Sequence, residues 1–453
     1  MARKYNREQI LSGNMLTAIL TLAIPVIFNS LIQTMYNLTD TYWLGKIGTE
    51  HMAAITLVSP IQSIVMNFGM GITSAGAILI SQYVGARDYK NAKAMTNQLF
   101  ACSMIFSIVC GVICCLLTPA MVHALGAEGN VFTYGRIYLQ IVILDMPFLF
   151  MINLFTAVNQ AQGDTVKPLI LNACGVVFNM ILDPIFMVVL DWGVAGAALA
   201  TLTAKVPCAM VAFWSLTRKA HSVHLNMKGF KFERNKLKEI IRIGLPTAIG
   251  NSTMQFGFVL MSKSVLAYGS TAVAAYGIGN RVNGLISTAS NAMGSATATI
   301  VGQNMGAGQV ERADKGYRMA RNMIVVFLAI GGVILSRPAI ARPIVSIFSS
   351  DEEVIQLGIE YLVVLAIYCW TNGIYNTTMG LLHGTGHTMI TMAIDASRLW
   401  VFRFITLFIC QSVLDMGVAS IWYCVVISNA LSSLVLFILY HLKVWQKNNI
   451  QLA

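Results

Sequence analysis

Asn179, Asp183 and Pro184 stand inside an almost wholly apolar run, NACGVVFNMILDPIFMVVLDW, from Asn172 to Trp192. Burying a carboxylate in lipid costs about 2.5 to 3.5 kcal/mol on insertion scales, so an acid inside such a run indicates a functional site. Helical spacing places Asn172, Asn179 and Asp183 on one face. Pro184 has no N–H, so the carbonyl four residues earlier loses its helical donor. Two side chains with oxygens and a free carbonyl on one face would suit a small cation or a proton relay.

The elements that must position these residues are membrane helices. Of the 453 residues, 56% are hydrophobic and 11% are charged, whereas soluble domains carry about 25% charged residues. The net charge of +11 comes from basic residues in short loops, which indicates membrane topology rather than nucleic-acid binding. We therefore predict an all-α polytopic membrane protein with twelve spans. Their approximate limits are 15–40, 52–82, 94–118, 136–158, 168–190, 194–216, 239–264, 271–304, 319–346, 357–381, 389–413 and 418–441.

Basic residues alternate between the loops. They precede the first span and follow the second, fourth, sixth, eighth and twelfth, whereas most of the other loops are poorer in Lys and Arg. The positive-inside rule therefore places both termini in the cytoplasm, as an even number of spans requires. The loop after the sixth span is the longest and most basic. We expect an N-terminal lobe over 1–216, a basic cytoplasmic linker over 217–238 and a C-terminal lobe over 239–453.

The two halves of the chain repeat. ILTLAIP at Ile19–Pro25 matches IIRIGLP at Ile240–Pro246, and in the same register SQYVGA matches GQNMGA. Further on, AQGDT matches GTGHT and LDWGVA matches LDMGVA. The offset between the halves is slightly larger here, so the second half has gained only a few residues. Each half holds six spans, an even number, so both halves have the same orientation. The sequence thus predicts two six-helix lobes related by a parallel pseudo-two-fold repeat, as in one class of secondary transporters.

These motifs make the chain resemble the multidrug and toxic compound extrusion (MATE) family, and its DinF-like bacterial branch in particular. The resemblance is carried by AIPVIFNSLIQTMYNLTDTYWLG, SQYVGARDYKNA and AQGDTVKP, and by their counterparts GLPTAIG, GQNMGAG and GTGHT. It implies alternating access by two lobes and export of small organic cations against an inward flow of H⁺ or Na⁺. It also implies a monomer in the lipid bilayer of the bacterial inner membrane, with no cofactor.

The resemblance further implies a coupling-ion site in the N-terminal half. Its members are two acids, an amide and a hydroxyl, at Asp40, Asn179, Asp183 and Thr201. Sodium is the only metal expected there. Under the repeat, Asp40 matches Met261 and Asp183 matches Thr406, so neither acid has an acidic twin, which favours a function over a scaffold role. Two neighbouring carboxylates in a low dielectric cannot both ionise cheaply, so a proton, a sodium ion or a cationic substrate would relieve their repulsion.

Several further residues are candidates. The expected hinges are Pro25, which can kink the first span, and Pro184. The candidates for substrate binding or cavity lining are Tyr36, Asp145 and Asn153. Two alternatives stay open: Asp40 and Asp145 could each lie at a wet outer end of a helix. Asp395 and Arg398 are spaced for an intrahelical ion pair, with a wider charge network that includes Arg403 as the alternative.

No enzyme motif is present in the sequence. It contains no GxxxxGK[ST] loop for ATP, no HExxH and no nucleophile elbow, so we expect no enzyme and an ion gradient as the energy source. One alternative is a lipid-linked oligosaccharide flippase of the same superfamily, whose cavity should be lined with Arg and Lys. A second is a non-transporting membrane receptor or scaffold, which would show no gradient-driven flux.

Overall fold

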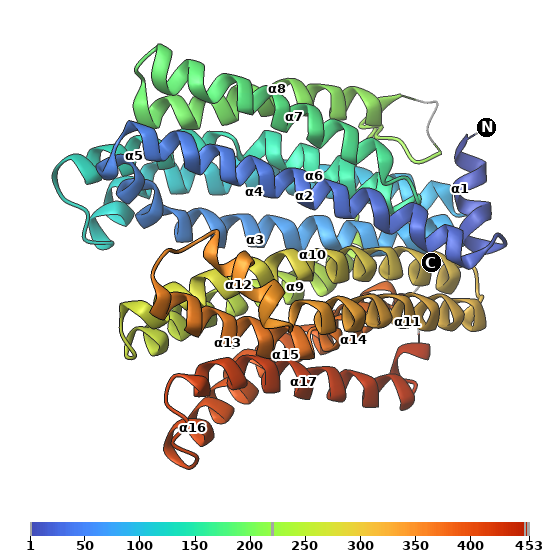
Figure 1. Cartoon of the computed structure of the whole chain (residues 1–453). Coiled ribbons are helices and arrows are strands. Elements are labelled where there is room, and N and C mark those ends of the chain that lie inside the picture. Colours follow the sequence, from blue (N-terminus) through green and yellow to red (C-terminus); the bar gives the residue numbers. More distant parts are fainter. Residues whose placement is uncertain (1, 219–221, 448–449, 451–453) are drawn as a thin grey trace. The chain divides into compact units, whose positions relative to one another are not determined.

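The computed structural model describes residues 2–218, 222–447 and 450. Within these ranges the chain is helical and has no strand, which confirms the all-α class (Figure 1). The contacts divide the chain into two compact units. Unit 1 consists of two segments, the residues up to Arg7 and Ile24–Ala248. Unit 2 consists of Glu8–Ala23 and the residues from Ile249 onward. Of the three boundaries, one falls inside a short N-terminal helix after Arg7, and the other two fall inside long helices, next to Pro25 in one and just after Pro246 in the other.

Unit 1 is a helical bundle in which individual helices each pack against several others. Its elements are α1 (Ala2–Leu11, shared with unit 2), α2 (Met15–Ile47, likewise shared), α3 (Thr49–Gly85), α4 (Tyr89–Ala124), α5 (Gly129–Leu144), α6 (Met146–Ala161), α7 (Val166–Pro184), the π-helix η1 (Ile185–Val189) and α8 (Gly193–Thr217). Helix α3 packs against α4, α5 and α6, and α8 packs against α5, α6 and α7.

Unit 2 repeats this plan. Its elements are α9 (Arg234–Leu266, shared with unit 1), α10 (Ser270–Gly306), α11 (Val310–Leu335), α12 (Pro338–Ser346), α13 (Glu352–Tyr368), α14 (Trp370–Gly384), α15 (Thr388–Ala396), the π-helix η2 (Ser397–Arg403), α16 (Phe404–Ser412), α17 (Ala419–His441) and the short η3 (Val444–Gln446). Helix α10 packs against α11, α13 and α14, and α17 packs against α13, α14, η2 and α16. These are the partners that the repeat assigns to α3 and α8.

The backbone conformation also recurs at repeat-related positions. Asp191 and Asp415, the aspartates of the LDWG and LDMG motifs, both have a positive φ, at 52° and 47°. Arg87 at φ 61° corresponds to Gly308 at φ 73° in the register that matches SQYVGA to GQNMGA. A non-glycine residue rarely adopts this conformation, so its recurrence shows that the two halves fold alike at these turns.

The predicted spans correspond to helices, and two of the spans are pairs of helices joined at a sharp bend. The fourth span is the pair α5 and α6, bent by 44°, and the tenth is α13 and α14, bent by 51°. The ninth span was predicted to run to residue 346, but α11 ends at Leu335 and Pro338 opens the separate helix α12. Proline is tolerated at the first turn of a helix, whereas inside a helix it removes a hydrogen bond. The N-terminal helix α1 was not predicted.

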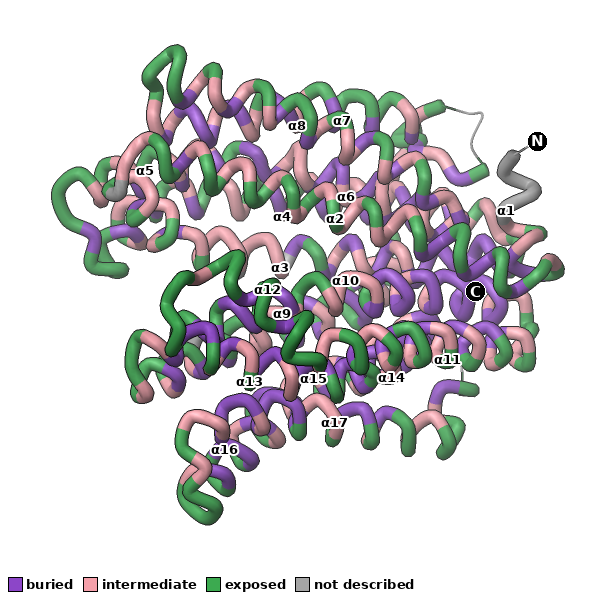
Figure 2. Tube along the Cα trace, viewed as in Figure 1, coloured by how far each residue is buried: buried purple, intermediate pink, exposed green. Residues whose placement is uncertain are grey.

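The outer surface of the helices is apolar. Among the described residues, seven helices are long and apolar enough to cross a membrane, or nine if each bent pair counts as one span. Three predicted spans do not meet this criterion of length and apolar character. Helices α9 and α10 contain many Asn, Ser, Thr and Gly residues, and η2 interrupts the stretch α15–α16. Exposed residues lie along the outer faces in Figure 2, and those of α4 include Ile108, Val112 and Leu116. Such faces suit contact with lipid tails.

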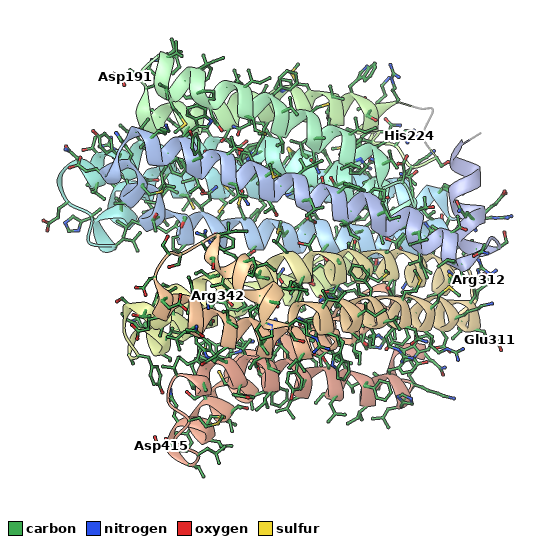
Figure 3. The ribbon with its side chains drawn as sticks, viewed as in Figure 1. Asp191, His224, Glu311, Arg312, Arg342 and Asp415 are labelled. Carbon is green, nitrogen blue, oxygen red and sulfur yellow. The ribbon has the colours of Figure 1, made fainter. Side chains whose placement is uncertain are left out.

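Polar and charged residues in loops or in the first turn of a helix mark the two ends of each unit. In unit 1, Asp191 lies at one end of the helices and His224 at the opposite end (Figure 3). In unit 2, Asp415 lies at one end, while Glu311 and Arg312 lie at the other. These polar ends are therefore separated by the apolar length of the helices, as a membrane protein requires.

Candidate functional site

A chain of hydrogen bonds links three helices of unit 1. The Asn179 amide on α7 donates to Asp183 Oδ1 at 3.2 Å and to Thr201 Oγ1 on α8 at 3.3 Å. The Tyr36 hydroxyl on α2 lies 3.3 Å from the same Thr201 oxygen. Asn179 and Asp183 stand one helical turn apart, so a single face of α7 presents both. The structure thus brings together three of the four predicted coupling residues and Tyr36.

Two oxygens in this cluster have no hydrogen-bond partner. Asn179 Oδ1 and Asp183 Oδ2 are both buried and unpartnered. Asp40 lies one turn beyond Tyr36 on α2 and is close enough to Asp183 to interact with it electrostatically. Buried acceptors normally find a donor, and carboxylate and amide oxygens are the ligands that hard cations and protons prefer. The arrangement can therefore hold a proton or a small cation.

The buried Asp145 lies at the break between α5 and α6. Its carboxylate forms an ion pair with Lys205 of α8, while Asp145 Oδ1 stays without a partner. Lys205 stands one turn beyond Thr201 on α8, so both reach inward from one face. Asp145 also borders a small enclosed cavity lined mostly by α3 and α5 residues such as Val65 and Leu139. It therefore has a built-in countercharge, unlike Asp183.

Sequence reasoning missed Lys205 and a neighbouring tyrosine. Lys205 interrupts the apolar stretch ALATLTAKVPCAM, and a lone lysine there signals a functional or paired position as strongly as Asp183 does. Tyr138 on α5 lies within electrostatic range of Asp40, Asp145 and Asp183. No pattern in the sequence marked Tyr138, since aromatic residues are common in membrane helices.

The remaining unit 1 candidates lie around this cluster. Asn172, on the same face of α7, donates to Asn29 Oδ1 of α2 at 2.9 Å, so it ties two helices together rather than joining the acids. Asn153 is half-buried on α6, and no hydrogen bond joins it to the cluster described above. Pro184 ends α7 and is followed directly by the π-helix η1. Such π-turns occur frequently at functional sites.

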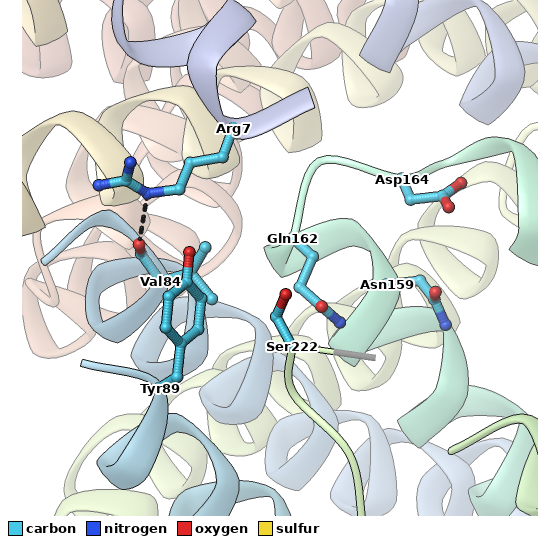
Figure 4. Close-up of a pocket in the computed structure, with 7 residues that line it drawn as sticks. All are labelled: Arg7, Val84, Tyr89, Asn159, Gln162, Asp164 and Ser222. Atoms are coloured by element: carbon cyan, nitrogen blue, oxygen red, sulfur yellow. Dashed lines mark hydrogen bonds between the residues drawn. The ribbon is translucent and has the colours of Figure 1, made fainter. Parts of the chain in front are cut away.

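A second polar pocket lies near one end of unit 1. It is lined by Arg7, Val84, Tyr89, Asn159, Gln162, Asp164 and Ser222 (Figure 4). The Arg7 guanidinium donates to the carbonyls of Val84 and Gly85, at 2.9 and 2.6 Å. The cavity has a volume of about 20 Å³, which accommodates little more than a water molecule. Through its two hydrogen bonds, Arg7 ties α1 to the end of α3.

Unit 2 carries a basic cluster on η2. Arg403 donates to Ser428 Oγ at 3.1 Å and to Asn429 Oδ1 at 3.3 Å. Arg398 stacks on the ring of Tyr375, whose hydroxyl donates to Asp395. No ion pair joins Asp395 to Arg398 among the described residues, so the predicted intrahelical pair is not formed. Among the same residues, no group of three or more His, Cys, Asp and Glu side chains could hold a metal ion.

Comparison with known proteins gives one family and several relatives. The MatE family model matches residues 25–185 and 246–409. The chain is 26% identical over 432 residues to the multidrug export protein MepA of Staphylococcus haemolyticus, covering 94% of this chain and 93% of that protein. It is 24% identical over 393 residues to the probable multidrug resistance protein YpnP of Bacillus subtilis, covering 86% and 87% of the two chains.

Solved structures share the fold over nearly the whole chain. The crystal structure of a MATE protein in complex with MaL6 has a TM-score of 0.91 at 23% identity, covering 97% of this chain and 99% of that one. A transporter of the MOP superfamily from Pyrococcus furiosus has a TM-score of 0.91 at 22% identity, covering 97% and 98%. At these identities the likeness shows the fold, and it confirms the predicted twelve-helix arrangement.

Proposed function

This chain belongs to the MatE family of multi-pass membrane transporters, and on that premise we propose that it exports cationic amphipathic drugs by antiport with H⁺ or Na⁺. The relatives named as multidrug export and resistance proteins, which the chain matches over most of its length, support the export of drugs. We place it in the bacterial inner membrane, acting as a monomer with both termini in the cytoplasm. The basic loops that precede the first span and follow most of the even-numbered spans support this orientation.

The observation that carries the proposal is the pair of unpartnered oxygens, Asn179 Oδ1 and Asp183 Oδ2, buried next to Thr201 and near Asp40. An acceptor left without a donor in a low dielectric costs about 1–3 kcal/mol, so the site gains by taking up a proton or a cation. We assign the coupling ion to Asp40, Asn179, Asp183 and Thr201.

Coupling follows from the shared charge. A proton or a sodium ion at Asp183 and a cationic drug in the same lobe both neutralise the carboxylates, so each weakens the other's binding. Two ligands that favour different states of one protein exchange across the membrane as the states alternate. Helix α2 carries both Tyr36 and Asp40 of this region, with Pro25 earlier in the same helix. We infer that ion binding rearranges α2 near Pro25 and releases the drug.

Dye efflux from proteoliposomes tests this function. The protein is reconstituted with a cationic dye such as ethidium, and pH and sodium gradients are imposed separately. We expect efflux driven by one gradient and abolished in Asp183→Asn and Asp40→Asn. Asp191→Asn serves as the matched control, because Asp191 is an exposed loop acid of the same unit. Its backbone is left-handed, a conformation that asparagine tolerates. Full wild-type efflux in Asp183→Asn would rule out this coupling site.

A further inference from the structure

Arg398 in unit 2 is a buried cation without an ion-pair partner among the described residues. It lies on η2 with 9% of its surface exposed. Its Nε is buried and has no hydrogen-bond acceptor. Its Nη2 reaches the sulfur of Met254 at 3.6 Å, which is a weak acceptor. Burying a guanidinium costs several kcal/mol unless it is paired, so a group absent from the described residues is expected to complete its contacts.

The unfilled contacts lie on one edge of the guanidinium. Nε and Nη2 point in parallel from the same side of the group, and this edge binds the two oxygens of a carboxylate in a bidentate manner. The face of the guanidinium is held in place by a cation–π contact, because the guanidinium carbon lies 4.3 Å from the centroid of the Tyr375 ring. The side chain is thus oriented, while its carboxylate-binding edge has no acceptor beyond the Met254 sulfur.

The neighbouring charges leave this edge unused. Tyr375 donates its hydroxyl to Asp395, and that carboxylate lies outside ion-pair distance of Arg398. Arg403 donates instead to Ser428 and Asn429. With two guanidinium groups and one carboxylate, the cluster has a net positive charge. Its electrostatic preference is therefore for an anionic group.

The repeat shows that the fold does not require this arginine. In the register that matches AQGDT to GTGHT, Arg398 corresponds to Gly175 in unit 1, and Asp395 corresponds to Asn172. Unit 1 forms the same bundle with a neutral Asn172–Asn29 hydrogen bond and no side chain at Gly175. The charge in unit 2 is an addition to a shared scaffold.

We propose that Arg398 binds the carboxylate of a zwitterionic or anionic substrate through its Nε–Nη2 edge. The inference rests on the export function proposed above and extends it, because an amphipathic drug can carry a carboxylate as well as a cationic group. Met254, a flexible side chain, moves aside as the carboxylate oxygens replace its sulfur.

A matched pair of dyes tests this inference by direct binding. Rhodamine 110 carries a free carboxylate, and rhodamine 123 is its methyl ester. Their binding to the purified full chain in lipid nanodiscs is followed by fluorescence polarisation. We expect Arg398→Gln to raise the Kd of rhodamine 110 about tenfold or more, as the loss of a charge-assisted bidentate contact predicts, and to leave rhodamine 123 within about twofold.

Further variants separate the contact from a folding defect. Arg398→Lys keeps the charge but not the two-point edge, so it should also weaken rhodamine 110. Asp395→Asn removes a nearby negative charge that repels a substrate carboxylate and should tighten rhodamine 110. Arg281→Gln, an exposed arginine of α10, is the control and should change neither Kd. Equal effects of Arg398→Gln on both dyes, or no effect on rhodamine 110, would overturn the proposal.

If the wild-type chain binds neither dye, that result counts against the proposed export function but does not test Arg398. A second measurement then tests Arg398 directly. Phenylglyoxal modifies accessible arginines, and mass spectrometry locates the product. Protection of Arg398 by benzoate, with no protection of Arg281, supports the carboxylate site. An Arg398 that reacts equally with and without benzoate, or that never reacts, overturns it.

Discussion

The ion pair between Asp145 and Lys205 gives the sharpest test of the packing in unit 1. The exposed fraction of the side chain is 2% for Asp145 and 22% for Lys205. Lys205→Met leaves a fully buried carboxylate without its cation, which we expect to lower the free energy of unfolding by about 3–5 kcal/mol. Asp145→Leu leaves an ammonium whose side chain is partly exposed and less costly to leave unpaired, so we expect a smaller loss of about 1–3 kcal/mol.

The double variant distinguishes a paired charge from a packing loss. Replacing a buried ion pair by apolar residues of similar shape is often neutral or stabilising. Asp145→Leu with Lys205→Met should therefore be more stable than Lys205→Met alone, with a coupling energy of about 2 kcal/mol or more between the two sites. Denaturant-induced unfolding in mixed micelles measures all four forms.

The half-exposed pair of Asp164 and Lys167 is the control. Asp164 lies two residues before α7 and Lys167 in its first turn, and their side chains are 16% and 39% exposed, respectively. Exposed pairs contribute about 0–1 kcal/mol, so the same cycle should give a small coupling energy there. A Lys205→Met loss no larger than that of Lys167→Met, or a double variant no more stable than Lys205→Met, would refute the reasoning.

Two further predictions concern the core of unit 2. Gly380→Ala should lower the free energy of unfolding by about 1–3 kcal/mol, because a Cβ there would lie 2.2 Å from the Gly294 carbonyl of the adjacent helix. Gly331→Ala, where a Cβ meets open space, should instead be neutral or stabilising by up to about 1 kcal/mol, so equal effects in unfolding experiments would contradict this packing. Trp422→Ala should cost about 3–5 kcal/mol, since this buried indole stacks on Tyr361 at 4.4 Å. A loss below about 1 kcal/mol on denaturant-induced unfolding would show that the stack carries little stability.

Much of the fold was predictable because its signals are local. Apolar runs give the spans, and the recurring motifs give the repeat, whose left-handed turns at Asp191 and Asp415 then appear in both units. Helix breaks were less visible. The α5–α6 bend at Asp145 is followed by Pro147, a weak signal in a chain whose other helices contain prolines, and no glycine or proline adjoins the α13–α14 bend at Cys369. Pro338 signalled the end of α11, but the apolar residues after it led to a predicted span that was too long.

The sequence by itself determined which residues are costly in lipid. Asp183 and Asp145 were identifiable from their apolar surroundings, and Lys205 could have been found by the same argument, whereas Asp40 was identified from the family resemblance and from its lack of an acidic twin in the repeat. Such a cost is a property of the residue and its local stretch, so it needs no knowledge of the fold.

Only the tertiary structure decided which of these charges are paired. Asp145 finds Lys205 on a helix far along the chain, whereas Asp183 keeps an open oxygen and Arg398 an open edge. Their sequence positions do not distinguish them, because a partner is set by which helix faces meet. An ion pair or hydrogen bond acts over a few ångströms, and in this chain those distances are fixed by the packing of helices that are far apart in sequence.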